Sequence, residues 1–204
     1  NSILSKVENK KNALRFIIKI SKPYPKSKEA HFAVAHAAFF ANKRDLANEE
    51  LDIIKNIDSK WETAILFRGF IIQQDWPEKA EAFYRDYLRK NPTSNEVRLE
   101  YAKILTNLKK YDEAKKEFLK LVNGSLASSD MSLTVALLAI ELDDNVLAEK
   151  YFNQSLERGY SQPGQIYIYL ARIYEIRNDY DAAMSWLAKV SSGPNFLEAK
   201  ILGG

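Results

Sequence analysis

An alanine that returns every 33 to 35 residues is the feature that most constrains how this chain can fold. Each of these alanines opens the local pattern Ala-x-x-x-(large apolar)-x-x-(apolar), and the six copies begin at Ala13, Ala47, Ala80, Ala114, Ala148 and Ala183. The bulky residues four places later are Ile17, Leu51, Tyr84, Phe118, Phe152 and Leu187. A period of this length, kept along 204 residues, predicts structural units that stack on one another.

The spacing inside each copy predicts helices, because apolar residues at i, i+4 and i+7 line one helical face. Twelve residues before the five later alanines, four copies hold a second small residue: Ala35, Ala102, Ala136 and Ala171. Arg68, followed by Gly69, takes that place in the remaining copy. Small residues let two helices approach closely, so each unit is predicted to be a pair of packed helices.

This pattern resembles the tetratricopeptide repeat, whose 34-residue motif places small residues, an alanine, an aromatic residue and a proline at fixed positions. The best copy runs from Tyr101-Ala102 through Tyr111-Asp112-Glu113-Ala114 to Phe118. The chain departs from the motif at its first tryptophan, which is missing, and at its closing proline, which remains only as Pro25 and Pro92. The resemblance implies an all-α fold, a right-handed α-solenoid (superhelix) of about five helix-turn-helix repeats with flanking helices.

We expect a single solenoid over residues 1–204. Its parts are a half repeat at 1–26, repeats at about 28–60, 61–94, 95–128, 129–162 and 164–197, and the opening of a further helix at 198–204. No second helix follows to cover that last one, so the native chain is expected to continue. Exposed solenoid ends of this kind would favour a homodimer.

The resemblance also implies that the first helix of each pair lines a concave groove, with five positions of each repeat turned inward. Many of these residues are large and apolar, and such a helix face is usually covered by something. The candidate groove residues are Phe32, His36, Phe39, Phe40, Ile65, Ile72, Gln73, Leu99, Lys103, Asn107, Leu133, Leu137, Ile140, Ile168, Arg172 and Ile176. The lysine and asparagine with which co-chaperone repeats hold a carboxylate are absent from the matching positions.

Two occupants of the groove remain open. A partner helix or peptide would make the chain a non-catalytic protein–protein interaction scaffold. Alternatively, the amphipathic N-terminal residues 2–20 would fill the groove, and the chain would be a structural or self-associating module. Acids near the starts of four first helices, at Glu29, Glu62, Glu96 and Asp130, either form a rail for a basic peptide or complement the helix dipoles.

Composition argues against catalysis and against resident cofactors. The chain has no Cys, so thiolate metal sites and Cys nucleophiles are excluded. Its two histidines, His31 and His36, would point about 140° apart on a helix, which does not suit a shared metal. Phosphate-binding loops and hydrolase motifs are also missing. We therefore expect no enzymatic activity and no cofactor.

Charge and hydropathy address nucleic acid and membrane. A net charge of +3 is small, and an apolar, partly acidic groove would repel phosphate, so RNA binding by a helical repeat is only a minor alternative. No apolar stretch approaches the ~20 residues of a transmembrane helix. The sequence predicts a soluble protein and leaves cytoplasm and periplasm open, because any signal or anchor would precede residue 1.

The assigned register makes a direct prediction about helix packing. Replacing Ala114 with leucine should overpack the crossing between the two helices of its repeat and lower the free energy of unfolding by about 1–3 kcal/mol. Urea denaturation followed by circular dichroism measures this change. Unchanged stability would contradict the register.

Overall fold

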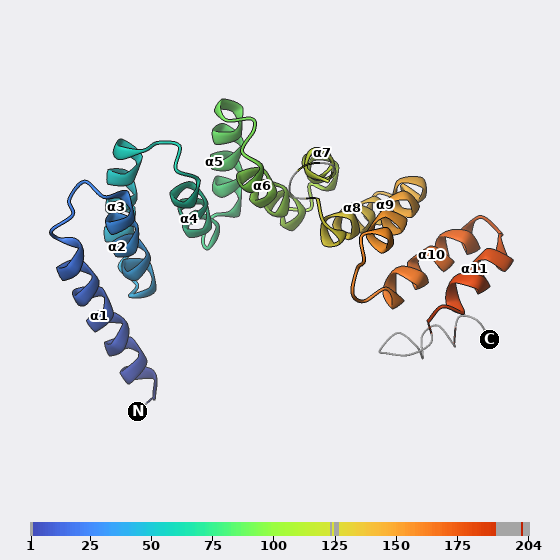
Figure 1. The fold of residues 1–204 in the computed structure, drawn as a ribbon, viewed down its shortest axis with the longest axis horizontal. Coiled ribbons are helices and arrows are strands. Elements are labelled where there is room, and N and C mark those ends of the chain that lie inside the picture. The colour runs from blue at the N-terminus through green and yellow to red at the C-terminus, as the bar shows by residue number, and fades with distance from the viewer. Residues whose placement is uncertain (1, 123, 125–126, 191–200, 202–204) are drawn as a thin grey trace. The chain divides into compact units, whose positions relative to one another are not determined.

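The computed structural model of this chain describes residues 2–122, 124, 127–190 and 201, with side chains from residue 8 onward. Over these residues the secondary structure consists of eleven α-helices and no strand (Figure 1). In chain order they are α1 (Ser2–Ser21), α2 (Lys28–Phe40), α3 (Arg44–Ile57), α4 (Glu62–Gln73), α5 (Pro77–Lys90), α6 (Asn95–Asn107), α7 (Tyr111–Leu121), α8 (Ser129–Glu141), α9 (Asn145–Glu157), α10 (Gly164–Ile176) and α11 (Tyr180–Leu187). The all-α prediction is confirmed.

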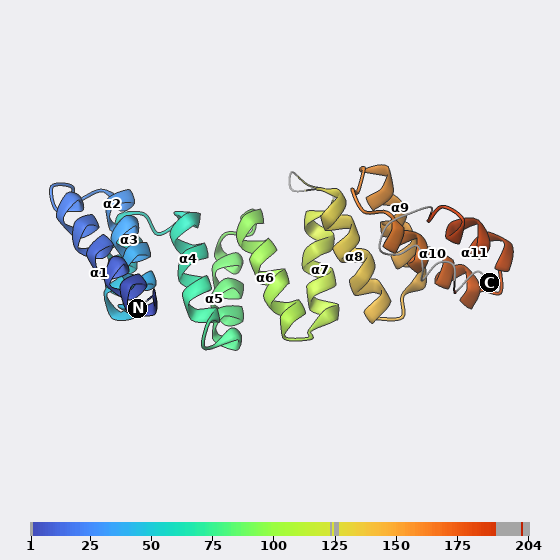
Figure 2. The same cartoon turned by 90° about the horizontal axis from the view of Figure 1, so that it is seen from below.

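The chain forms two compact units, Asn1–Glu100 and Tyr101–Gly204, and each is described by itself. In the first unit α2 packs against α1 and α3, and α4 packs against α3 and α5. In the second unit α8 packs against α7 and α9, and α10 packs against α9 and α11. Figure 2 shows the helices of these pairs side by side. Most of the further helix expected at 198–204 lies outside the described residues.

Within four of the five helix pairs, the connecting turn has the same backbone geometry. Its middle residue has a positive φ, at Asn42, Lys109, Asp143 and Asn178. In the first of these turns the N–H of Lys43 donates to the carbonyl of Ala38, which closes the end of α2 as in a Schellman motif. The turn between α4 and α5 differs, because its residues, Gln74 to Trp76, are described and none has a positive φ.

That different turn accompanies a one-residue shortening of α4. The helix has 12 residues, whereas α2, α6, α8 and α10 have 13 each. It begins 34 residues after α2 begins, but it ends only 33 residues after α2 ends. The missing residue therefore comes from the C-terminal end of α4. Counting twelve residues back from Ala80 gives Arg68, whereas the residue equivalent to Ala35 is Gly69. Each position of α4 found by that count is therefore one residue too early.

The small residues occupy the helix crossings, as the sequence predicts. Ala47, Ala80, Ala114, Ala148 and Ala183 are all buried, and so are Ala35, Ala102, Ala136 and Ala171. In α4 it is Gly69, not Arg68, that is buried. The expectation for Ala13 is wrong, because this residue is exposed and the next residue, Leu14, enters the core of the first unit in its place.

Gly69 permits the closest approach of α4 and α5. A Cβ atom at this position would lie 2.1 Å from Cζ of Tyr84, so no side chain fits there while the ring stays in place. The buried Tyr84 hydroxyl donates to the carbonyl oxygen of Leu66 at 3.0 Å. Burial, with a smaller contribution from the charge of Glu100, raises the pKa of Tyr84 well above its ordinary value, so the phenol stays protonated as a donor.

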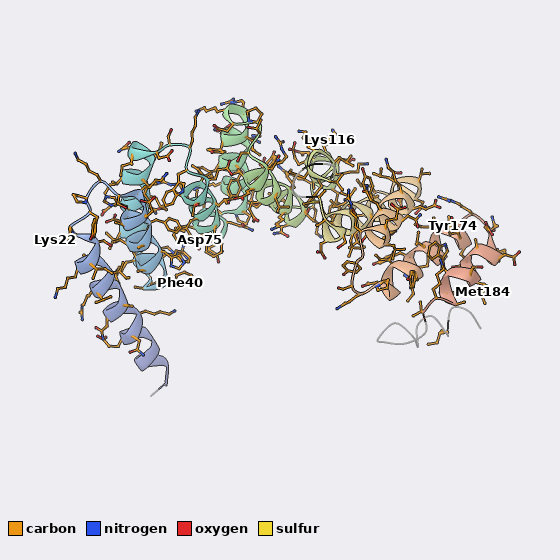
Figure 3. The ribbon with its side chains drawn as sticks, in the orientation of Figure 1. Lys22, Phe40, Asp75, Lys116, Tyr174 and Met184 are labelled. Carbon is orange, nitrogen blue, oxygen red and sulfur yellow. The ribbon has the colours of Figure 1, made fainter. Side chains whose placement is uncertain are left out.

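In the second unit, polar contacts join helices that belong to neighbouring pairs. Glu149 on α9 accepts hydrogen bonds from the Tyr174 hydroxyl and from the Arg177 guanidinium, both at 2.6 Å (Tyr174 is labelled in Figure 3). Burial alone would raise the pKa of Glu149, but these two donors outweigh it and lower the pKa. The hydrogen bond to Glu149 in turn raises the pKa of Tyr174. This network connects α9 to α10 beyond their apolar contact.

The contact at Gly69 has a testable consequence. In an open helix, changing glycine to alanine stabilises by about 1 kcal/mol. Here Gly69→Ala should instead lower the free energy of unfolding by about 1–3 kcal/mol, because Tyr84 must shift. Urea denaturation measures the change.

A double-mutant cycle with Tyr84→Leu is the control for this prediction. Once the ring is removed, Gly69→Ala should cost much less. A stabilising effect of Gly69→Ala in the wild-type background would show that α4 and α5 do not approach so closely.

Candidate interaction surface

Aromatic side chains from two helices gather in the first unit. Phe32, His36, Phe39 and Phe40 lie on one side of α2, because their spacing of i, i+4, i+7 and i+8 repeats nearly in phase with the helix. Phe67 and Phe70 of α4, and Trp61 at its start, come against them. These seven residues are called the aromatic surface below.

Ring-to-ring contacts hold the aromatic surface together. The ring centroid of Phe32 lies 5.3 Å from that of Trp61 and 5.4 Å from that of Phe67, both edge-on. Phe39 meets Phe70 edge-on at 5.6 Å. His36 lies 5.3 Å from Phe67 and 4.7 Å from Phe40. Edge-on contacts at these distances are the favourable arrangement for aromatic pairs.

The aromatic surface has a packed base and an exposed part. Phe32, Phe39, Trp61 and Phe67 are partly buried and pack against the core of the first unit. Phe40 remains 47% exposed and Phe70 41% exposed. His36 is exposed as well. A partner would therefore meet rings whose neighbours already fix their positions.

Ion pairs border the aromatic surface at two places. Lys28 lies over the Trp61 ring, 5.0 Å from its centroid, and pairs with Asp58 at 2.6 Å. The hydrogen bond from Lys28, together with the N–H of Lys60, lowers the pKa of Asp58. At the other border Arg44 lies over Phe39 at 5.8 Å and pairs with Asp75, which Figure 3 labels together with Phe40.

Glu29 shows what the acidic residues at helix starts do locally. Hydrogen bonds from its own backbone N–H and from the Ser27 hydroxyl, the latter at 2.8 Å, lower the pKa of its carboxyl. Ser27 in turn accepts from the N–H of Ala30 as the N-cap of α2. These contacts are those of an acid that supports a helix start.

The shortened α4 changes which of its residues reach the aromatic surface. Ile65, a candidate from the sequence, lines a cavity with residues of α3 and α5 instead. Ile72 and Gln73 are half-buried, and Ile72 shares the face of Ile65, which it follows by seven residues. The sequence pattern did not predict Phe67 and Phe70 as residues of this surface. The 33-residue spacing from Ala47 to Ala80, together with Gly69, was the signal that could have revealed Phe70.

The remaining candidates lie on α6, α8 and α10. Leu99, Leu133, Leu137 and Ile140 are half-buried, while Lys103, Asn107 and Arg172 are exposed. Ile176 is 66% exposed at the end of α10. Ile168 is only 3% exposed, because it packs with Ala171, Ala183, Leu187 and Val190 in the core around α10 and α11. That residue serves the core in this structure.

A comparison with protein families finds a match at the repeat copy that fits the motif best. Residues 96–123 match the family model of the tetratricopeptide repeat, and they contain the copy from Tyr101 to Phe118. The chain carries a tetratricopeptide repeat. The resemblance that the alanine period predicts is thereby confirmed, although the family model covers one repeat and not the whole chain.

Solved structures with tetratricopeptide repeats share the fold along most of the chain. The C-terminal part of a TPR repeat-containing protein from Cytophaga hutchinsonii is 16% identical, with a TM-score of 0.70 over 100% of this chain and 79% of that one. YrrB, described as a TPR protein with an unusual peptide-binding site, is 14% identical, with a TM-score of 0.69 over 91% and 96%. Pseudomonas aeruginosa pilF is 18% identical, with a TM-score of 0.62 over 95% and 99%.

At these identities the likeness to the solved tetratricopeptide-repeat structures shows the fold alone. No curated protein has a sequence that matches the chain. In the part of the chain that the structure describes, no group of three or more His, Asp or Glu side chains is placed to hold a metal ion. None of the described helices is both long and apolar enough to span a bilayer.

His31 positions α2, the helix that carries most of the aromatic surface. Its Nδ1 lies 2.5 Å from Oε2 of Glu50 on α3, and its Nε2 lies 3.0 Å from the carbonyl oxygen of Pro25. Burial alone would lower the pKa of His31. The hydrogen bonds to the Pro25 carbonyl and the Glu50 carboxylate outweigh burial and raise the pKa above its ordinary value.

The raised pKa of His31 predicts a pH dependence of stability. A group whose pKa is higher in the folded state stabilises the fold fully below its unfolded pKa, and this stabilisation is lost as the pH rises through the folded pKa. His31→Gln should therefore cost more unfolding free energy at about pH 6 than at about pH 8. Urea denaturation of both proteins at the two pH values tests this, and an equal cost would contradict it.

Proposed function

We propose that this chain is a non-catalytic protein–protein interaction module, and that its first unit binds a partner helix or peptide through the aromatic surface on α2 and α4. The main observation behind this proposal is that Phe40, Phe70 and His36 are exposed while their aromatic neighbours pack against the core. Tetratricopeptide-repeat proteins generally mediate protein–protein interactions, which supports this class of function. The helix pairs from α2–α3 to α10–α11 would be its repeats.

The physical advantage of such a surface is low ordering cost. A flexible surface loses side-chain and loop entropy when it binds, about 0.5–1.5 kcal/mol per immobilised side chain. Phe32, Phe39 and Phe67 have already lost that freedom in folding, because the core and the neighbouring rings hold them. Aromatic side chains also give large contact areas and are enriched among the residues that dominate binding energy.

A structural module, with the groove filled by the chain itself, is the second candidate. The packing of α1 against α2 supports it. Leu14 and Ile17 of α1, however, pack into the core cluster that also contains Val34 and Ala38. Phe40 and Phe70 remain exposed although α1 packs against α2, which favours an external partner. In the second unit, the half-buried Leu133, Leu137 and Ile140 of α8 are proposed as a further contact region.

The test compares the wild type with the double variant Phe40→Asp/Phe70→Asp as baits for affinity capture from a lysate of the source cells. Neither ring belongs to the buried core, so the variant should keep its helical circular dichroism and lose only part of its stability through the ring contacts, while capture of the partner falls at least about tenfold. Phe39 is left unchanged because it packs against the core, and its substitution would also change stability.

Val146→Asp/Met184→Asp is the matched control for this experiment, because it also replaces two exposed apolar residues with acids. Val146 on α9 is 75% exposed and Met184 on α11 is 48% exposed, and both belong to the second unit. This variant should capture the partner like the wild type. If the double variant captures the partner as well as the wild type does, the binding site lies on another surface. If neither the wild type nor the variants capture a partner, the result favours the self-filled module.

A further inference from the structure

A second feature of the first unit lies on the other side of α4. An open cavity of about 420 Å³ is bounded by α3, α4, α5 and the connection between α3 and α4. Its apolar lining consists of Leu51, Ile54, Ala64, Ile65, Phe83 and Tyr87. Small-molecule sites in proteins typically measure about 300–1,000 Å³ and are mostly apolar, with a few polar groups that fix the ligand. The cavity has the size and lining of such a site.

The charged groups of the lining are not balanced. Both of its carboxylates have partners outside the cavity, because Asp58 pairs with Lys28 at 2.6 Å and Asp86 with Arg89 at 3.8 Å. Of the four cations in the lining, Arg68 is paired, since it binds Asp52 of α3 at 2.8 Å. The other three cations are lysines.

Lys55, Lys60 and Lys90 are exposed, and their ammonium groups make no ion pair with any described residue. Glu62 adds a negative charge near the cavity, because after burial, which is the main cause, its charge contributes to the raised pKa of Tyr87. The lining therefore holds four cations and two carboxylates, and the single charge of Glu62 does not cancel this positive excess. An anion bound here would gain the pairing that the lysines lack.

The charged part of the cavity and its apolar part lie at different places along the helices. On α3 Lys55 follows Leu51 and Ile54, and on α5 Lys90 follows Phe83 and Tyr87. Lys60 lies in the connection that comes directly after α3. The cationic groups thus gather at the C-terminal ends of α3 and α5, and the apolar lining continues toward the middle of these helices.

We propose that this cavity binds a small amphipathic carboxylate, with its apolar chain against Ile65 and Phe83 and its carboxylate among Lys55, Lys60 and Lys90. The site is separate from the aromatic surface and does not depend on the proposed partner binding. An uncharged chain of equal length lacks the ionic contacts, and a cationic one is repelled. The cavity therefore selects the sign of the head group as well as the apolar chain.

The experiment uses decanoate as the probe, below its micelle-forming concentration, with decanol and decyltrimethylammonium as comparisons. Isothermal titration gives the affinities, and methyl NMR shifts of Ile54 and Ile65 locate the bound chain. Decanoate should bind at least about tenfold more tightly than decanol, a preference that weakens as salt is added. Equal affinity for decanoate and decanol, or shifts confined to residues outside the cavity, would overturn the proposal.

Two variants test the lining directly. Lys55→Gln/Lys60→Gln/Lys90→Gln should lose about tenfold in decanoate affinity, which corresponds to about 1.4 kcal/mol. Lys11→Gln/Lys26→Gln/Lys43→Gln changes the net charge equally at exposed lysines outside the cavity and should bind like the wild type. Ile65→Trp, which fills the cavity and keeps every charge, should abolish binding.

A purely structural role for the lysines makes a different prediction. Lys55 and Lys90 lie in the last turns of α3 and α5, where a positive charge stabilises the negative end of the helix dipole. If that were their only role, the cavity triple variant would lose stability but bind decanoate as the wild type does. Such a result would overturn the proposal. Unchanged binding by Phe40→Asp/Phe70→Asp is also required, because it separates this site from the aromatic surface.

Discussion

The close approach of paired helices at small side chains is the constraint on which the rest of the structure depends. Buried alanines recur at the crossings, and Gly69 takes this role between α4 and α5. A helix that meets its neighbour at this distance must turn one fixed face toward it, so every other side chain of that helix is oriented by the crossing. Which residues remain available for binding follows from this orientation.

The shortening of α4 shows how strongly the crossing controls the surface. Gly69 lies 34 residues after Ala35 but only 11 before Ala80, whereas the other small residues lie 12 before their alanine, and it is Gly69 that meets Tyr84 at the crossing. Phe70 then reaches the aromatic surface, and Ile65 lines the cavity. The two proposed binding regions thus lie on different sides of one helix.

Several cations of the first unit support the fold by pairing with carboxylates on other elements. Lys28, Arg44 and Arg68 each pair with a carboxylate on another element, and His31 pairs with Glu50 across α2 and α3. Exposed pairs of this kind contribute little energy each, but Lys28 and Arg44 also lie over the rings of Trp61 and Phe39. Lys55, Lys60 and Lys90 differ from the other unpaired lysines of this unit because they line an apolar cavity, where an unpaired charge can serve binding.

The sequence by itself determined the helical class, the repeat period and the buried small residues, because apolar periodicity and residue size act within one or two turns of the chain. It also placed Phe32, His36, Phe39 and Phe40 on one helix face. Only the tertiary structure decided that Phe67 and Phe70 join them, that Ile168 is core and that Leu14 replaces Ala13. The reason is that a regular period cannot reveal where a single residue is missing, whereas contacts such as that of Gly69 with Tyr84 depend on which faces meet in space.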